Sequence, residues 1–192
     1  KFNEEITKNI RLFISGSAPL LTETHKEFEY RTGHKILERY GMTETNMITS
    51  NPYIGERKAG TVGMVLEDVE IRIADLEIED VVKKIGDIGV VEVKGPNVFK
   101  GYWKLPEKTK SEFRDDGYFI TGDMGFLDHD KYLTIVGRNK DLIITGGLNV
   151  YPKEIETVID QDSMVDESAV VWVSHPDFGE GILAIIVEKK GH

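Results

Sequence analysis

The sequence contains no cysteine, which excludes a disulfide framework, a thiolate metal site and a cysteine nucleophile. Basic residues are also scarce: 24 Lys and Arg stand against 34 Asp and Glu, giving a net charge of −10. A nucleic-acid scaffold normally carries a basic face, so this balance argues against one, although local Arg and backbone N–H groups can still bind a nucleotide. Long apolar runs are missing too, because stretches such as 182–187 are far too short to span a bilayer.

The remaining composition is that of an ordinary globular protein. The 192 residues are 40% hydrophobic and 30% charged, which allows one or two domains and a real core. No signal peptide is visible, and Lys1 is not a natural start, so we expect the true N-terminus to lie upstream. A cytoplasmic location is the default expectation, and the sequence gives no oligomeric state.

The first half of the chain alternates strands and helices and then changes to short strands. The pattern predicts a strand at 11–15, a helix at 19–32 that ends before Gly33, and a strand at 35–40. From residue 59 onward, turn signals separate runs typical of an antiparallel or barrel-like subdomain. The predicted strands there are 69–73, 90–94, 118–120 and 132–136, with a short helix at 106–113.

The last third has a different pattern. A strand at 141–145 is followed by the turn Gly146-Gly147, and Pro152 begins a helix. The helix carries Ile155, Val158 and Ile159 at the spacing of one apolar face. Two further strands, at 168–173 and 182–188, complete the pattern. We expect the start of a small α+β domain.

Several side chains after the strand at 35–40 suit nucleotide chemistry. The ring of Tyr40 can stack on adenine, and Gly41 lets the backbone approach a ligand closely. The hydroxyl of Thr43 can donate to a phosphate oxygen, and Glu44 offers a hard oxygen ligand for Mg²⁺. An ordinary strand end followed by a polar turn would look the same in isolation.

A second group of candidate residues lies further along the chain. The carboxylate of Asp123 can accept hydrogen bonds from both hydroxyls of a ribose, and Gly122 and Gly125 keep the approach open. Arg138 presents a fork of donors suited to ribose or phosphate oxygens. Taken singly, Asp123 also fits a turn former and Arg138 a surface residue at a strand end.

In order and spacing, residues 38–45, 121–123 and 137–141 resemble the nucleotide-handling motifs of the acyl-adenylate-forming, or AMP-binding, enzymes. The resemblance implies a reaction in which a carboxylate attacks the α-phosphate of ATP, giving an acyl-AMP and pyrophosphate. It implies ATP, Mg²⁺ and coenzyme A as cofactors. The implied fold is α/β plus α+β, with residues 1–139 in a large ATP- and acid-binding domain and 140–192 in the first part of a small mobile domain.

The resemblance also implies a role for individual residues. Thr43 and Glu44 would be catalytic, with Glu44 holding the metal, and Lys140 would be the hinge between the domains. The residues implied to bind cofactors are Gly16, Ser17, Ala18, Tyr40, Gly41, Asp123, Arg138, Gly146 and Gly147. Residues 95–96, 101–103 and 106–109 match a further family motif that offers no obvious catalytic group. We expect this motif to be structural and its aromatic residues to lie in the core.

Arg39 indicates which carboxylic acid is the substrate. A buried Arg beside the acyl pocket would be costly unless it met a second carboxylate. The segments 15–20, 38–46 and 95–102 are similar to malonate-activating members of the family, the malonyl-CoA synthetases. That similarity implies malonate or methylmalonate as the acid, with Arg39, Ser17 and Met42 as substrate-binding residues.

Other interpretations remain open. Arg39 could instead pair with Glu38 or Glu44 as structural support. The acid could be fatty, aromatic or an amino acid, or the chain could be a nucleotide-binding module without catalysis. In the resemblance, the family's phosphate-binding loop would lie before residue 1 and its catalytic Lys after residue 192. We therefore expect the chain alone to be inactive.

Overall fold

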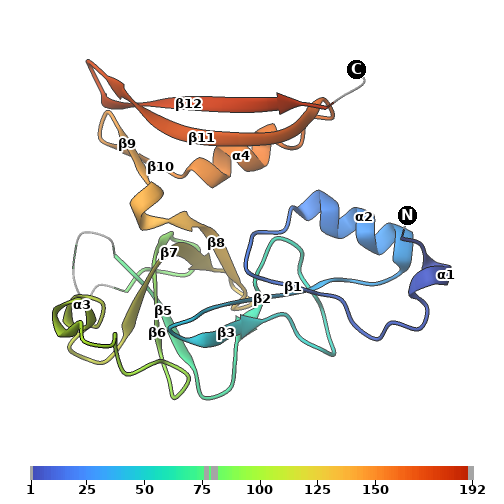
Figure 1. Ribbon diagram of the computed structural model, residues 1–192, viewed down its shortest axis with the longest axis horizontal. Helices are drawn as coiled ribbons and strands as arrows, with labels where there is room; N and C mark the ends of the chain where they lie inside the picture. The colour runs from blue at the N-terminus through green and yellow to red at the C-terminus, as the bar shows by residue number, and fades with distance from the viewer. Residues whose placement is uncertain (1, 76–77, 79–81, 190–192) are drawn as a thin grey trace. The chain divides into compact units, whose positions relative to one another are not determined.

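The computed structural model describes residues 2–75, 78 and 82–189 and divides into two compact units (Figure 1). The first unit contains the residues up to 121 together with 125–135. The second contains 122–124 and the residues from 136 onward. No helix in the described part of the chain is long and apolar enough to cross a membrane.

The first sheet of the first unit has the order β1-β2-β3-β4. Its strands are β1 (Ile14–Ser15), β2 (Leu37–Met42), β3 (Asn46–Ser50) and β4 (Met64–Val65). Strands β1 and β2 are parallel, whereas β2, β3 and β4 pair antiparallel in turn. The predicted strand at 35–40 is therefore confirmed as β2, which runs directly into a hairpin.

Two helices accompany this sheet, α1 (Glu4–Thr7) and α2 (Thr22–Thr32), and α2 links the parallel strands β1 and β2. The predicted start of α2 at Pro19 was wrong, because Leu21 has an extended backbone that delays the first helical turn to Thr22. The predicted end is confirmed. Gly33 has a left-handed φ of 69°, and its N–H donates to the carbonyl of Glu29.

The short strands predicted beyond residue 59 form a second sheet of order β5-β6-β7-β8. They are β5 (Glu70–Ala74), β6 (Gly89–Lys94), β7 (Phe119–Leu127) and β8 (Leu133–Arg138), and α3 (Pro106–Ser111) lies between β6 and β7 in the chain. Strand β7 is longer than predicted. It continues from Phe119 through Gly122 and Gly125 to Leu127, and its residues Thr121 and Asp123 are buried.

The apolar core of this part consists of two clusters. One contains Ile48, Val93 and Phe119, and the other contains Ile73, Val91 and Leu133; Tyr40 packs against both. The rings of Phe99 and Phe113 pack around Phe119, with centroids 5.3 Å from it. The expectation that the aromatic residues at 101–103 lie in the core was wrong for Trp103. This side chain is 85% exposed because it lies in the turn before α3, where Lys104 has a left-handed φ of 56°.

The second unit contains a sheet of order β10-β9-β12-β11. Its elements are the 3₁₀ helix η1 (Asn139–Asp141), β9 (Ile143–Thr145), β10 (Leu148–Val150), α4 (Pro152–Ile159), β11 (Val165–His175) and β12 (Gly179–Glu188). Gly146 and Gly147 form the predicted turn, with left-handed φ values of 56° and 82°. The small α+β pattern is confirmed.

Helix α4 contacts β11 through polar as well as apolar groups. The N–H of Val170 donates to Glu156, and the hydroxyl of Ser168 donates to Asp160. On the predicted apolar face, Val158 is 67% exposed.

Glu92 of β6 is a fully buried carboxylate held by two guanidinium groups. The Nε–H of Arg72 donates to Oε2 at 2.6 Å, and the Nε–H of Arg114 donates to Oε1 at 2.8 Å. Both carboxylate oxygens are thus paired, which compensates the cost of removing the charge from water. The interaction joins β5, β6 and the loop that precedes β7.

Replacing Glu92 by Gln is expected to lower the free energy of unfolding by about 3 kcal/mol, because the negative charge that both guanidinium groups share at this buried site is lost, even though Arg72 keeps its ion pair with Asp116. Urea denaturation at neutral pH measures the loss. The matched control is Glu70→Gln, an exposed Glu on the neighbouring strand, which should change stability by less than about 0.5 kcal/mol. Equal losses in the two variants would contradict a special role for Glu92.

Candidate active site

The β2–β3 hairpin carries the residues with the strongest chemical signal. Tyr40 and Gly41 lie within β2, and residues 43–45 form the turn to β3. The register pairs Tyr40 with Thr49 but Gly41 with Met47, so β3 has one extra residue at this point. A Cβ added at Gly41 would lie 2.0 Å from the carbonyl oxygen of Asn46. Gly41 is therefore needed for close contact between the two strands. Its predicted role in the close approach of a ligand stays a prediction.

The two faces of β2 have different environments. Tyr40 and Met42 point to one face and pack against the apolar cluster around Ile48. Met42 thus has a packing role, and its predicted substrate-binding role stays a prediction. Arg39 and Gly41 point to the other face, where they line a pocket.

This pocket has a volume of about 180 Å³ and is lined by Ile14, Gly16, Ser17, Arg39, Gly41 and Met47. Gly16 lies against Arg39, since a Cβ added there would be 3.5 Å from the Arg39 Cγ. Ser17 has a left-handed φ of 70°, which is unusual for a residue with a side chain. Ala18 is exposed and does not line the pocket. The pocket brings together four of the residues singled out from the sequence, from two segments of the chain.

Arg39 does not have the burial assumed for it. Its side chain is exposed in this chain, so it carries no large desolvation cost here. Within the described residues, no ion pair joins it to Glu38 or Glu44, the two structural partners considered from the sequence. The guanidinium is available to a ligand in the pocket.

Glu38 instead lies on the buried side of the strand, with Oε1 3.2 Å from Nδ1 of His25. Burial raises the pKa of Glu38 to about 7, against a smaller lowering by a backbone hydrogen bond from Gly60. Burial also lowers the pKa of His25. The distance would fit an ion pair, but burial disfavours both charged forms, so we describe the contact as a hydrogen bond between neutral groups.

The carboxylate of Glu44 is half-buried and fixed from a distant part of the chain. The hydroxyl of Tyr102 donates to its Oε1 at 3.1 Å. Burial and the hydrogen bond to Glu44 raise the pKa of Tyr102 to about 12. Thr43 beside it is exposed. The described residues contain no group of three or more His, Asp or Glu side chains that could hold a metal by themselves. Glu44 fits a metal that takes one protein carboxylate and completes its shell with phosphates and water, as Mg²⁺ does.

Asp123 and Arg138 meet as the sequence suggested. Arg138 Nε lies 3.2 Å from Asp123 Oδ1. Asp123 on β7 is 6% exposed, whereas Arg138 at the end of β8 is largely exposed. The pair combines an acceptor with a fork of donors, the set of groups that a ribose or phosphate requires.

Lys140, Gly146 and Gly147 lie in the second unit. Lys140 is exposed within η1. The N–H of Gly146 donates to the carbonyl of Phe178, whose ring would lie 3.3 Å from a Cβ at Gly146. The β9–β10 turn is therefore packed against the β11–β12 turn, and an added side chain at Gly146 would be both strained and crowded.

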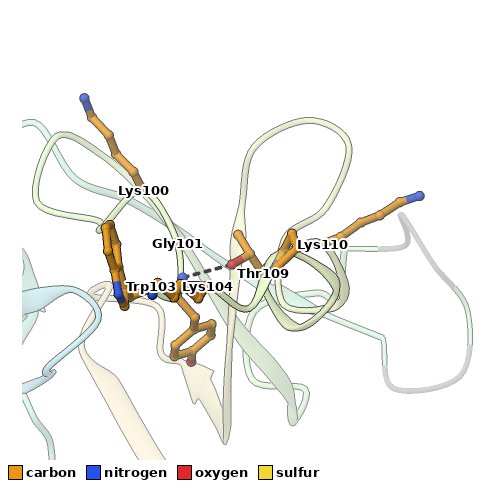
Figure 2. A pocket seen from close by; sticks show the side chains of 8 residues that line it. Lys100, Gly101, Trp103, Lys104, Thr109 and Lys110 are labelled. Carbon is orange, nitrogen blue, oxygen red and sulfur yellow. Dashed lines mark hydrogen bonds between the residues drawn. The ribbon is translucent and has the colours of Figure 1, made fainter.

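A second pocket, of about 420 Å³, lies between residues 100–104 and α3 (Figure 2). Lys100 and Lys110 point away from it in different directions, so these cations do not converge on a common point. Thr109 lies inside and accepts a hydrogen bond from the N–H of Tyr102. Through this hydrogen bond, the residues that line the pocket hold the backbone at Tyr102 in place.

The sequence reasoning missed three residues of the site. Ile14 and Met47 line the pocket with Arg39. The place of Ile14 in the pocket could have been predicted, because it lies two residues before Gly16. The place of Met47 could not, because it depends on the irregular register of the hairpin. Tyr102 lies 58 residues from Glu44, and its only signal was membership of a motif assigned a structural role.

Residues 1–103 match the family described as AMP-binding enzyme. The chain belongs to this family. As an AMP-binding enzyme chain, it is 61% identical to ATP-bound MatB from Rhodopseudomonas palustris, with a TM-score of 0.96 over 100% of this chain and 38% of that one. It is 43% identical to a malonate–CoA ligase of Arabidopsis thaliana, over 95% of this chain and 29% of the relative. It is also 37% identical to a long-chain-fatty-acid–CoA ligase of Yersinia pestis, over 97% of this chain and 34% of the relative.

These comparisons confirm the predicted family, its mixed α/β fold and the predicted similarity to malonate-activating members. This AMP-binding enzyme chain spans about a third of the length of the relatives it matches.

Replacing Glu38 by Gln is expected to change how stability depends on pH. In the folded protein Glu38 keeps its proton up to about pH 7, against an ordinary pKa of 4.5. The stability that this group contributes is therefore present below pH 4.5 and falls as the pH rises toward 7. Gln cannot ionise and lacks this fall.

Thermal unfolding from pH 5 to 8 measures the effect. The difference in stability between Glu38→Gln and the parent should grow with pH, by up to about 3 kcal/mol. The control is Glu27→Gln, an exposed carboxylate of α2 paired with Arg31. Parallel pH curves for Glu38→Gln and the parent would show that burial does not raise the pKa of Glu38.

Proposed function

We propose that the protein to which this chain belongs is an ATP-dependent acid–thiol ligase that activates malonate or methylmalonate. The carboxylate would attack ATP to give an acyl-AMP and pyrophosphate, and the acyl group would then pass to coenzyme A. The observation that carries the proposal is the exposed guanidinium of Arg39 in a pocket with Ser17, without an ion-pair partner among the described residues. The similarity to MatB and to a malonate–CoA ligase supports it.

Arg39 distinguishes a dicarboxylate from a simple acid. One carboxylate of malonate must react, and the other stays ionised and needs a partner inside the pocket. A guanidinium can bind it with two parallel, charge-assisted hydrogen bonds. Ser17, which lines the same pocket, can donate one more. A pocket built for this second carboxylate rejects acids that lack it, because Arg39 then loses its partner.

The nucleotide is assigned to the residues that the sequence singled out. Asp123 would accept hydrogen bonds from the ribose hydroxyls, and Arg138, 3.2 Å away, would donate to the same sugar or to phosphate. Tyr40 would stack on adenine with part of its ring, although its other contacts lie in the core. Thr43, exposed in the hairpin turn, would donate its hydroxyl to a phosphate oxygen.

Glu44 would hold Mg²⁺. Its Oε1 accepts from Tyr102, and its Oε2 has no hydrogen-bond partner among the described residues, so one oxygen is available to a cation. When bound, the ion would supply positive charge to the phosphates of ATP. Glu44 and Thr43 are therefore the residues of this chain that we assign to the reacting phosphates.

The second unit is assigned to thioester formation. We place the boundary between the large and the small mobile domain at 139/140, with the exposed Lys140 as a hinge that stays solvated during rotation. The Gly146-Gly147 turn would line the path of the pantetheine arm. The cytoplasm is the proposed location.

A monocarboxylic acid is the second candidate substrate. The observation in its favour is the 37% identity to a long-chain-fatty-acid–CoA ligase over 97% of this chain. The nucleotide and metal residues would keep the same roles in that enzyme. Arg39 would then contribute little to the choice of acid.

The test is pyrophosphate release by the full-length protein with ATP, Mg²⁺ and a panel of acids. Malonate or methylmalonate should be the preferred acid, and Arg39→Ala should lower kcat/KM for it about 100-fold, the size of a hydrogen-bonded charge pair. Acids with one carboxylate should be affected much less. The control is Arg31→Ala on α2, whose side chain is exposed and paired with Glu27.

Two results would contradict the proposal in different ways. A preference for a monocarboxylic acid that Arg39→Ala leaves unchanged would retain adenylate chemistry and remove the malonate assignment. Binding of AMP without pyrophosphate release from any acid would indicate a nucleotide-binding protein without catalysis. The isolated 192-residue chain should release none.

A further inference from the structure

We propose that Tyr102 is a positioning residue for Glu44, and that the segment 97–109 holds the hairpin turn 43–45 in the geometry that metal binding requires. The inference rests on the proposed role of Glu44. It assigns a function to a motif that offers no catalytic group of its own and that the sequence reasoning left as structural.

Four hydrogen bonds connect the segment to the hairpin, three to the turn 43–45 and one to β3. The hydroxyl of Tyr102 donates to Glu44 Oε1 at 3.1 Å, and the N–H of Phe99 donates to the Glu44 carbonyl at 2.8 Å. Nδ2 of Asn97 donates to the carbonyls of Thr45 and Met47, at 2.8 and 3.1 Å. Glu44 is therefore held by both its backbone and its side chain, from a part of the chain more than fifty residues away.

Tyr102 is itself fixed on three sides. Its N–H donates to Thr109 Oγ1 at 2.9 Å, the interaction drawn in Figure 2. Its ring packs edge-on against Phe99, with centroids 4.8 Å apart, and the ammonium of Lys108 lies 4.7 Å from the ring centroid. Gly101 has a φ of +143°, and a Cβ added there would lie 2.6 Å from Thr109 Cγ2. The close packing of this turn on α3 therefore fixes where the hydroxyl points.

The arrangement leaves Glu44 with one oxygen directed by the protein and one available. A free glutamate on a hairpin turn samples several rotamers, and a cation must select one of them at an entropic cost. Tyr102 makes that selection in advance. Hydrogen bonds from outside the coordination shell orient metal ligands in this way, and losing one typically weakens metal binding by 10–100-fold.

Tyr102→Phe in the full-length protein tests the inference, because Phe keeps the ring and removes only the hydroxyl. The Mg²⁺ concentration that half-saturates pyrophosphate release should rise about tenfold. A readout that does not depend on turnover is binding of Mn²⁺ in the presence of α,β-methylene-ATP, followed by electron paramagnetic resonance, and its Kd should rise by a similar factor.

The matched control is Tyr118→Phe. The Tyr118 hydroxyl also donates to a glutamate, Glu70, at 2.9 Å, but on an exposed surface outside the site. This variant should shift neither the Mg²⁺ requirement nor Mn²⁺ binding. A second variant, Thr109→Val, removes the acceptor of the Tyr102 N–H and should shift both in the same direction as Tyr102→Phe.

Glu44→Gln separates this inference from the proposed function. If Glu44→Gln weakens Mn²⁺ binding strongly and Tyr102→Phe does not, the metal assignment stands and the positioning role is overturned. If neither variant changes Mn²⁺ binding, the assignment of Glu44 fails and the positioning role fails with it. A Tyr102→Phe variant that loses thermal stability and kcat without any shift in Mn²⁺ binding would show a purely structural residue.

Discussion

The close contact between Gly41 and the backbone of Asn46 is the constraint on which the rest of the site depends. A side chain at position 41 would overlap the carbonyl of Asn46, so the hairpin closes in this register only with glycine. Closing it places residues 43–45 in a tight turn and brings Met47 beside Arg39. Asn97, Phe99 and Tyr102 then bind the hairpin by four hydrogen bonds, three to the turn and one to β3. The pocket around Arg39 and the position of the Glu44 carboxylate thus both depend on one hairpin.

Buried charge is handled in two different ways beside this hairpin. Glu92 is fully enclosed but has a guanidinium on each oxygen, so its charge is compensated within the protein. Glu38, one residue from Arg39, has only His25, and burial favours the neutral forms of both. The first arrangement stabilises the sheet at neutral pH. The second places a group that titrates near neutrality next in the chain to Arg39 of the pocket.

Much of the fold could be predicted because local patterns determined it. Gly33 ended α2 and Gly146-Gly147 formed a turn as their backbone preferences required. Asp123 and Arg138 came together because their strands, β7 and β8, are neighbours in one sheet. The predictions failed where contacts between residues far apart in the sequence determine the structure. Nothing local to Gly41 shows that it faces Asn46, and the exposure of Trp103 depends on a turn at Lys104. The partnership of Tyr102 with Glu44 spans 58 residues and has no periodic signal.

The alternation of side chains along β2 has a consequence for how such an enzyme can change. Arg39 faces the pocket, while the residues on either side of it, Glu38 and Tyr40, face the interior. A substitution at Arg39 can therefore change the chemistry of the pocket without disturbing the packing that keeps the protein folded. One face of the strand is committed to the core, while the other tolerates replacement in single steps that each leave a stable protein.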